Sequence, residues 1–228
     1  MSRASLMKGA AVLVFDFFAG TGSSTKAFDE AGDTVVSFDN DARFDVTETV
    51  DVASLSADDL VARYGRPDFV WASPPCTAFS VASIGRHWVS PTVPRTDQAL
   101  EAMVLVGKTR ELLEALSPRF GFVIENPRGM LRKLDVLAGL PRYTVTYCQY
   151  GDDRMKPTDL WSTVEGWFPL PACKSGDACH VSAPRGSRTG TQGLDDSVLR
   201  SMVPFGLGAE IRSVIVGKKV ADNVALLW

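Results

Sequence analysis

The sequence predicts an α/β fold, in which a mostly parallel sheet carries helices on both faces. Strand-like and helix-like segments alternate over the first two thirds of the chain, as they do in consecutive βαβ units. The first strand-like runs are almost continuously apolar, which is typical of parallel strands buried on both faces. From Trp167 to Gly193 the chain is rich in Gly, Pro, Ser and Thr without periodicity, which predicts a small irregular insert.

Each element follows from its local pattern. The run AVLVFDF predicts a strand over 11–17, and a Gly-containing turn then leads into a helix over 23–31. Gly65 ends a helix over 57–65, and Ser117-Pro118 ends a long helix over 97–116. TVVSFD, DFVWA and FGFVIE predict buried strands over 34–39, 68–72 and 120–125. We further expect a helix over 130–140, an alternating strand over 143–150, a strand over 158–164 that can pair with it, and a helical tail over 194–228 packed on the core.

Composition and charge limit the class of protein. With 228 residues, of which 45% are hydrophobic and 22% charged, the chain suits one globular domain with a substantial core. No apolar run reaches about 18 residues, so we expect no membrane span. The N-terminal region lacks the cleavage pattern of a signal peptide, and four cysteines do not make a disulfide framework. A net charge of −3 gives no sign of a polyanion partner, so any such binding needs local basic patches.

The stretch DFFAGTGSSTKAF (16–28) places a Gly-rich turn between the first strand and the following helix. Such a turn lets backbone N–H groups meet a polar or anionic ligand, although it can also be purely structural. The next strand ends in Asp39, and an acidic residue some 20 positions after the glycines suits ribose hydroxyls. Because the third glycine of a dinucleotide fingerprint is missing, we expect a nucleoside cofactor other than NAD.

A cysteine and a carboxylate follow two other strands. Cys76 comes directly after Pro74-Pro75, and taken alone it reads as a small core residue. Glu125 ends a buried strand and is followed by Asn126 and another proline. Since the carboxyl ends of parallel strands line the ligand crevice, Cys76 and Glu125 should share one rim with the glycine turn and Asp39. A thiol near a proton-bearing carboxyl suggests covalent catalysis with acid assistance.

The motifs DFFAGTGSST, ASPPCTAFSVA, ENPRG and YGDDRMKPT, in this order, resemble those of the DNA (cytosine-5) methyltransferases over residues 11–163. The resemblance implies a Rossmann-like, S-adenosylmethionine-dependent methyltransferase sheet. It also implies that Cys76 attacks C6 of a flipped-out cytosine, that Glu125 shares a proton with N3, and that Arg154 binds the O2 side. The cofactor residues that it implies are Phe18, Gly20, Gly22, Asp39, Asp51 and Pro74.

The same resemblance implies double-stranded DNA as the partner. Because the sequence shows neither a signal peptide nor a membrane span, we expect a cytoplasmic protein of a bacterial or phage-infected cell, and we expect it to be a monomer. Residues 76–95 would be a mobile loop that closes over the base. The expected DNA contacts, each of which could equally be a solvated side chain, are Ser80, Ser83, Arg86, Arg95, Lys156, Arg185, Arg188 and Gln192. We divide the chain into a catalytic core (1–163), a short target-recognition insert (164–199) and a C-terminal helical segment (200–228).

The sequence departs from the family pattern in three places. After Tyr150-Gly151 the family has a Gln and two Arg residues, whereas this chain supplies Arg154 and Lys156 with no clear Gln. The recognition region is very short, and the C-terminal Gly-Asn-Ser segment that completes the cofactor pocket has no clear counterpart. Three alternatives therefore stay open: an RNA cytosine-5 methyltransferase, a noncatalytic nucleic-acid-binding relative, and a folate-dependent pyrimidine C5 enzyme.

The insert carries a candidate metal site. Its residues Cys173, Cys179 and His180, together with Cys148, make a Cys₃His set of the kind that zinc takes as a closed structural site. Zinc would order an insert that has little hydrophobic core of its own. The spacing matches no standard zinc finger, and isolated reduced cysteines are the alternative interpretation.

Overall fold

The computed structural model describes residues 11–90, 92–181, 194 and 196–225. Its main sheet has seven strands in the order β3-β2-β1-β4-β7-β9-β8. These are β1 (Leu13–Phe17), β2 (Thr34–Asp39), β3 (Glu48–Thr49), β4 (Phe69–Ala72), β7 (Phe122–Pro127), β8 (Arg142–Thr146) and β9 (Pro157–Ser162). The first five strands of that order pair in parallel, and β9 runs antiparallel to both β7 and β8. The predicted α/β class with a mostly parallel sheet is confirmed.

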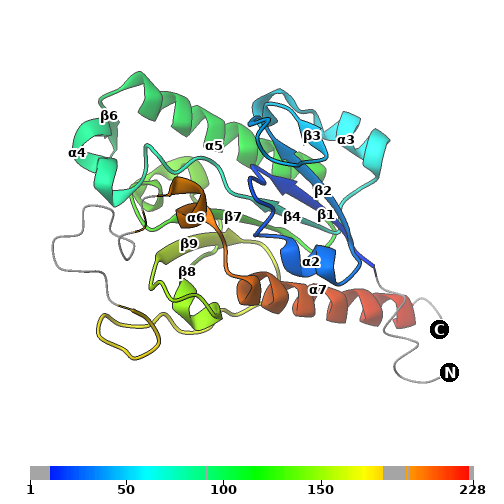
Figure 1. Cartoon of the computed structure of the whole chain (residues 1–228). Helices are drawn as coiled ribbons and strands as arrows, with labels where there is room; N and C mark the ends of the chain where they lie inside the picture. The colour runs from blue at the N-terminus through cyan, green and yellow to red at the C-terminus, as the bar shows by residue number, and fades with distance from the viewer. Residues whose placement is uncertain (1–10, 91, 182–193, 195, 226–228) are drawn as a thin grey trace.

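Helices cover both faces of this sheet (Figure 1). On one face, α3 (Ala57–Tyr64) packs against α5 (Asp97–Leu116), while on the other face α2 (Lys26–Glu30) packs against the C-terminal α7 (Phe205–Ala225). A short α6 (Ser197–Ser201) precedes α7. α7 contributes Leu207, Ile211 and Ile215 to the core on this face. In the parts of the chain that the structure describes, no helix has the length and apolar character to cross a membrane.

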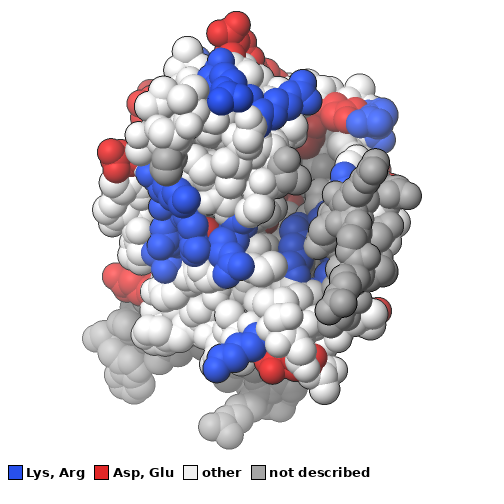
Figure 2. Space-filling view, turned by 90° about the vertical axis from the view of Figure 1, so that its left-hand side faces the viewer, with Lys and Arg blue, Asp and Glu red and all other residues white. Residues whose placement is uncertain are grey.

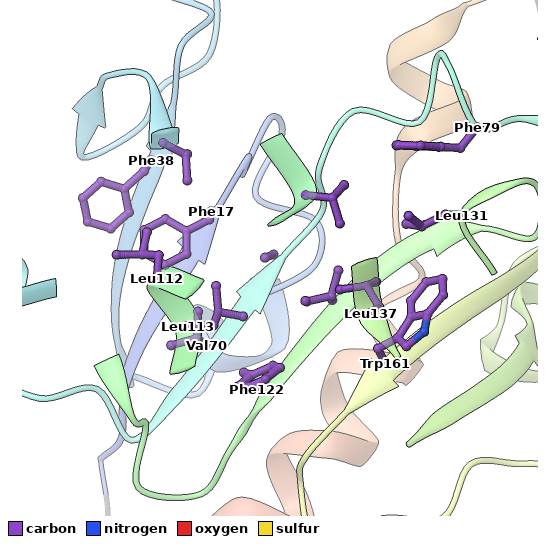
Figure 3. Close-up of a cluster of buried hydrophobic side chains, with 14 of the residues drawn as sticks. Phe17, Phe38, Val70, Phe79, Leu112, Leu113, Phe122, Leu131, Leu137 and Trp161 are labelled. Carbon is purple, nitrogen blue, oxygen red and sulfur yellow. The ribbon is translucent and has the colours of Figure 1, made fainter. Parts of the chain in front are cut away.

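The core is two clusters of buried side chains, one on each face of the sheet. Figure 3 shows the cluster beneath α5, which runs without a break from Phe38 and Phe17 at one end to Phe79 and Leu131 at the other. Phe79 belongs to the loop after β4, so this cluster also anchors that loop. The position of the loop is thus set by the same apolar packing that stabilises the fold.

The predicted helix over 130–140 is wrong. The segment instead forms two 3₁₀ turns, Leu131–Lys133 and Asp135–Leu137, whose N–H groups bond carbonyls three residues back. Leu131, Leu134 and Leu137 are all buried. Leu134 joins the two turns with an extended backbone (φ −98°, ψ 146°), so the three leucines do not share the face of one helix. Their apolar spacing reflects burial in the core cluster beneath α5.

The loop between β4 and α5 contains short elements of its own. A 3₁₀ turn (Val81–Ser83) leads into α4 (Ile84–His87), which is followed by the two-stranded sheet of β5 (Trp88–Ser90) and β6 (Val93–Pro94). In contrast, residues 163–181 form neither helix nor strand, as expected for an irregular insert. Val164 and Trp167 are buried in the core cluster beside α7, whereas none of the residues 168–181 is buried.

Candidate active site

The order in which successive strands are added to the sheet reverses between the parallel neighbours β1 and β4. β2 and β3 extend the sheet on one side of this pair, and β7 extends it on the other. In open α/β sheets the ligand crevice lies at such a switch point, outside the carboxyl ends of the strands. The glycine turn follows β1 and Cys76 follows β4, so both lie at this position.

The glycine turn is held by the carboxylate of Asp39. Gly20 and Gly22 have φ of 52° and 69°, a left-handed conformation that glycine adopts without strain. The Gly20 N–H donates to Asp39 Oδ2 at 2.9 Å, and the Asp41 N–H donates to Asp39 Oδ1 at 2.9 Å. A carboxylate has about four lone-pair sites, so acceptor capacity remains on Asp39 for a ligand. No atom of the described residues lies within 4 Å of the position that a Cβ would take at either glycine, which leaves the turn open to a ligand on this side.

Two further predicted cofactor residues lie near this turn. Phe18 has a φ of 59° and is partly buried against the apolar cluster under α5. Asp51 is exposed, and its side chain accepts a hydrogen bond from the Ala53 N–H, capping the 3₁₀ turn Val52–Ser54. Their roles toward a cofactor stay predictions.

A buried carboxyl that the sequence analysis did not single out supports the turn from below. Asp16 on β1 is fully buried, and its Oδ2 accepts hydrogen bonds from Ser24 Oγ at 2.8 Å and Thr25 Oγ1 at 2.7 Å. Its Oδ1 has no partner among the described residues. Burial raises the pKa of Asp16 to about 7, although the two hydroxyl groups oppose the rise. An aspartate inside an apolar strand was the only available signal.

The Pro-Pro-Cys turn is fixed by the neighbouring strand β7. Asn126 is fully buried, and its Nδ2 donates to Pro74 O at 2.9 Å. After the thiol the chain turns back, because the N–H groups of Phe79 and Ser80 both donate to Cys76 O at 2.9 Å. Cys76 is therefore held from both sides. Burial and the nearby charge of Glu125 raise the pKa of its thiol above the ordinary value.

Glu125 lies at the carboxyl end of β7 and is 5% exposed. Its Oε1 accepts a hydrogen bond from the hydroxyl of Tyr147 at 3.1 Å. Burial raises the pKa of Glu125, while Lys156 and hydrogen bonds from Ser73 and Tyr147 oppose the rise. Tyr147 was missed because it follows an edge strand, where the sequence alone does not show which side chain turns inward.

Lys156 and Arg200 bring positive charge to the thiol. Both lower the pKa of Cys76, against the larger effect of burial, and Lys156 also acts on Glu125. The Lys156 ammonium donates to Arg200 O at 2.8 Å and lies 4.6 Å from the centre of the Tyr147 ring. Burial in turn lowers the pKa of Lys156. Lys156 thus belongs to the same cluster as Cys76, Glu125 and Tyr147.

Arg154 lies beside this cluster and is 7% exposed. Its guanidinium forms an ion pair with Asp152, and it also donates to Leu199 O at 2.8 Å and Met202 O at 3.3 Å. These contacts fasten the segment before α7 to the connection between β8 and β9. The predicted contact of Arg154 with a base stays a prediction, because its donors are directed to the protein in this structure.

The predicted nucleic-acid contacts fall into two groups. Within the loop after β4, Ser80 and Ser83 join their hydroxyls at 3.0 Å, and Arg95 donates to Gly85 O at 3.0 Å, while Arg86 is exposed. Arg185, Arg188 and Gln192 lie outside the described residues. Figure 2 shows that Lys and Arg side chains gather around the hollowed centre of the face that carries α4, with Asp and Glu mostly toward its edges.

The candidate metal ligands converge. One ligand atom from each of Cys148, Cys173, Cys179 and His180 lies within 4.8 Å of the other three. Cys148 belongs to the 3₁₀ turn Tyr147–Tyr150, whereas the other three come from the irregular segment 168–181. The structure therefore brings together all four residues that the composition of the insert suggested.

Comparison with known proteins gives the family. No protein-family model matches the chain. Among solved structures, the S. pombe Dnmt2 methyltransferase has a TM-score of 0.43 at 14% identity, over 67% of this chain and 49% of that one. A SAM-dependent methyltransferase from Agrobacterium tumefaciens has a TM-score of 0.39 at 17% identity, over 70% of this chain and 57% of that one. The chain spans about half the length of these two proteins.

A curated relative is much nearer in sequence. The chain is 31% identical over 174 residues to the "Probable DNA (cytosine-5)-methyltransferase" of Frog virus 3 (isolate Goorha), and the match covers 73% of this chain and 77% of the relative. The match extends over most of both sequences. The structure also places Cys76 and the buried Glu125 at the same end of two neighbouring strands, β4 and β7. The chain belongs to the DNA (cytosine-5) methyltransferase family.

Proposed function

We propose that the protein transfers a methyl group from S-adenosylmethionine to C5 of cytosine in DNA, through a covalent bond between Cys76 Sγ and C6 of the base. The observation that carries this proposal is the pairing of Cys76 with the buried Glu125. Cys76 follows β4, and Glu125 is the third residue from the end of the neighbouring parallel strand β7, near enough for the charge of Glu125 to raise the pKa of the thiol. The relative from Frog virus 3 supports DNA as the substrate.

The chemistry needs both residue types. C5 of cytosine is a weak nucleophile until a thiolate adds to C6, which makes C5 part of an enamine. Electron density then moves toward N3, where a protonated Glu125 can deliver its proton. Because burial raises the pKa of Glu125, the protein favours this acid form. The Tyr147 hydroxyl fixes the position of the carboxyl.

The proton on Glu125 also promotes ionisation of Cys76. A charged Glu125 raises the pKa of the thiol, so protonation of Glu125 removes one of the two causes of the rise. Lys156 and Arg200 then favour the thiolate through their positive charge. In this mechanism Lys156 acts at the thiol rather than on a DNA phosphate. Arg154 supports the segment that carries Arg200 through its bonds to Leu199 O and Met202 O. Arg154 also remains our candidate for contact with the O2 side of the base.

The residues around the glycine turn suit S-adenosylmethionine. Asp39 can accept from ribose hydroxyls, the open backbone at Gly20 and Gly22 admits the methionine part, and the apolar Phe18 and Pro74 border it. Asp51 offers a carboxylate to the adenine edge. When bound, S-adenosylmethionine supplies an electrophilic methyl group. After C5 carries the methyl group, the C5 proton passes to water, Cys76 leaves C6 as a thiolate, and N3 returns its proton to Glu125, which restores the aromatic base.

The substrate base must leave the duplex, because C6 is not accessible inside the stack. The basic face in Figure 2 suits a phosphate backbone, and the loop over 76–95 borders the thiol. Ser80, Ser83, Arg86 and Arg95 are our candidates for contacts with the flipped nucleotide and its neighbours. We assign recognition of a short target sequence to the insert, including Arg185, Arg188 and Gln192.

Methyl transfer from labelled S-adenosylmethionine to duplex DNA and to structured RNA tests this function. We expect label in duplex DNA, at C5 of cytosine in base-resolution sequencing, and none with Cys76→Ala although that variant still binds DNA. Label in RNA alone would replace the proposed substrate. Methylation by Cys76→Ala would exclude the covalent mechanism.

A further inference from the structure

We propose that Cys148, Cys173, Cys179 and His180 bind one structural zinc ion, which fastens the irregular insert to the wall of the active site. The four ligand atoms belong to two parts of the chain that are separate in sequence. Cys148 lies in the 3₁₀ turn that follows β8 and is buried, whereas the other three lie in the segment 168–181. A single ion would therefore join the core to the insert.

Three of the four distances measured between the ligand atoms match those of a tetrahedral ion. With Zn–S of about 2.3 Å and Zn–N of about 2.0 to 2.1 Å, a regular tetrahedron places two sulfurs about 3.8 Å apart and a sulfur and a nitrogen about 3.6 Å apart. Cys179 Sγ lies 3.7 Å from Cys148 Sγ and 3.6 Å from His180 Nδ1, and Cys173 Sγ lies 3.7 Å from His180 Nδ1. Cys148 Sγ and Cys173 Sγ are nearer, at 3.1 Å.

That nearer pair is not a disulfide. A disulfide bond is about 2.05 Å long, and all four cysteines of the chain are free thiols in the structure. The donor set of three sulfurs and one imidazole nitrogen is one that closed structural zinc sites use. Gln149 Nε2 also donates to Cys179 Sγ at 3.4 Å, a hydrogen bond of the kind that orients a metal ligand from outside the first sphere.

Beyond Trp167, which is buried in the core, the segment 168–181 needs such a ligand because apolar packing does not hold it. None of the residues 168–181 is buried, and Phe168 is 78% exposed. Other contacts with the core are hydrogen bonds, among them Cys173 N to Thr146 Oγ1 at 2.9 Å and Val181 N to Asp153 O at 3.0 Å. Metal binding can supply the folding free energy that a small, poorly packed segment lacks.

The site shares a 3₁₀ turn with a residue that contacts Glu125. Cys148 follows Tyr147, whose hydroxyl bonds Glu125, and Asp153 precedes Arg154. An ion at the cluster would therefore position the insert against the turn that borders Cys76 and Glu125. Whether this placement aids DNA binding depends on the proposed function, whereas the metal site itself does not.

Metal analysis of the full chain, expressed in zinc-containing medium, tests the proposal. We expect one zinc ion per chain, and after exchange for cobalt the visible bands of a tetrahedral site with a thiolate charge-transfer band. Cys179→Ser and His180→Ala replace ligands at the surface, so these variants should fold but lose the zinc. Cys76→Ser is the matched control, because it removes the one cysteine outside the cluster and should retain the zinc.

Three results would overturn the proposal. These are zinc no higher than in a metal-free control protein, equal zinc in wild type, Cys179→Ser and His180→Ala, or a disulfide between Cys148 and Cys173 in the intact mass of the alkylated, unreduced protein. A separate measurement of DNA affinity should show weaker binding by Cys179→Ser than by Cys76→Ser. If zinc follows the variants as expected but neither protein binds DNA, the proposed function fails while the metal site stands.

Discussion

Gly129→Ala should reduce turnover strongly although residue 129 makes no contact with the reacting atoms. A Cβ at this position would lie 2.1 Å from Phe79 O and 3.1 Å from the carbonyl carbon of Phe79. Ordinary contacts between carbon and oxygen are about 3.3 Å or longer, so the two segments must separate by about 1 Å. The approach is this close because the Met130 N–H donates to Phe79 O at 2.7 Å.

The displacement would reach Cys76 through the backbone. The N–H groups of Phe79 and Ser80 both bond Cys76 O, so the turn that carries the thiol moves with Phe79. A misplacement of about 1 Å can cost about 10²-fold in rate, which corresponds to about 2.7 kcal/mol of transition-state stabilisation. Overpacking of this kind also lowers the free energy of unfolding by about 1 to 3 kcal/mol.

The assay is kcat for methyl transfer at saturating substrate, with thermal unfolding measured on the same samples. Gly107→Ala in α5 is the matched control, because its Cβ would lie 3.6 Å from Val136 Cγ2 of the 3₁₀ turn Asp135–Leu137, an ordinary van der Waals contact. We expect the control to keep its activity and to gain up to about 1 kcal/mol in stability. A folded Gly129→Ala variant with the turnover of wild type would refute the claim that this contact positions Cys76.

Other predictions concern titration and folding. Glu125→Gln should lower the pKa of Cys76 and Lys156→Met should raise it, because the two charges act on the thiol with opposite sign. The rate of Cys76 alkylation as a function of pH measures both pKa shifts. Shifts in the same direction in the two variants would contradict the arrangement. Asp16→Asn should flatten the dependence of stability on pH. With the pKa of Asp16 raised from 3.8 to about 7 in the folded state, its stabilising contribution is complete below about pH 4 and is lost as pH rises through about 7. The difference between the two pKa values corresponds to at most about 4 kcal/mol of folding free energy. Chemical denaturation at several pH values measures this pH dependence of the unfolding free energy. Equal pH profiles for wild type and Asp16→Asn would contradict the raised pKa of Asp16.

The sequence predicted the parts of this fold that depend on local pattern. The bounds of β2 and α5 agree with prediction to the residue, because a short segment of β-branched and aromatic residues that ends at Asp39 and a helix that ends at Ser117-Pro118 both have clear end signals. The prediction of a helix over 130–140 failed because the spacing of Leu131, Leu134 and Leu137 suits one face of a helix, whereas the chain forms two short 3₁₀ turns joined by an extended Leu134. Local pattern does not decide between these two conformations without the packing partner.

The site was predictable where residues follow strand ends and less so where they do not. Cys76 and the glycine turn could be placed together because β1 and β4 are parallel strands that end on one edge. Tyr147 directly follows β8 and Lys156 directly precedes β9, at the antiparallel edge of the sheet. The pairing of β8 and β9 with β7 decides which side chains there point toward the site. Sequence spacing therefore favoured Arg154, whereas the structure brings Lys156 to the thiol.

Trapping of the covalent intermediate tests the central claim most directly. In a DNA duplex with fluorine in place of hydrogen at C5 of cytosine, the final loss of a C5 proton is impossible, so Cys76 should remain bonded to C6. With S-adenosylmethionine present, intact-mass analysis should show one protein–DNA adduct, and peptide mapping should place it on Cys76, with no adduct in Cys76→Ser. An adduct on another residue, or methylation of ordinary duplexes without any adduct on the fluorinated one, would contradict the mechanism.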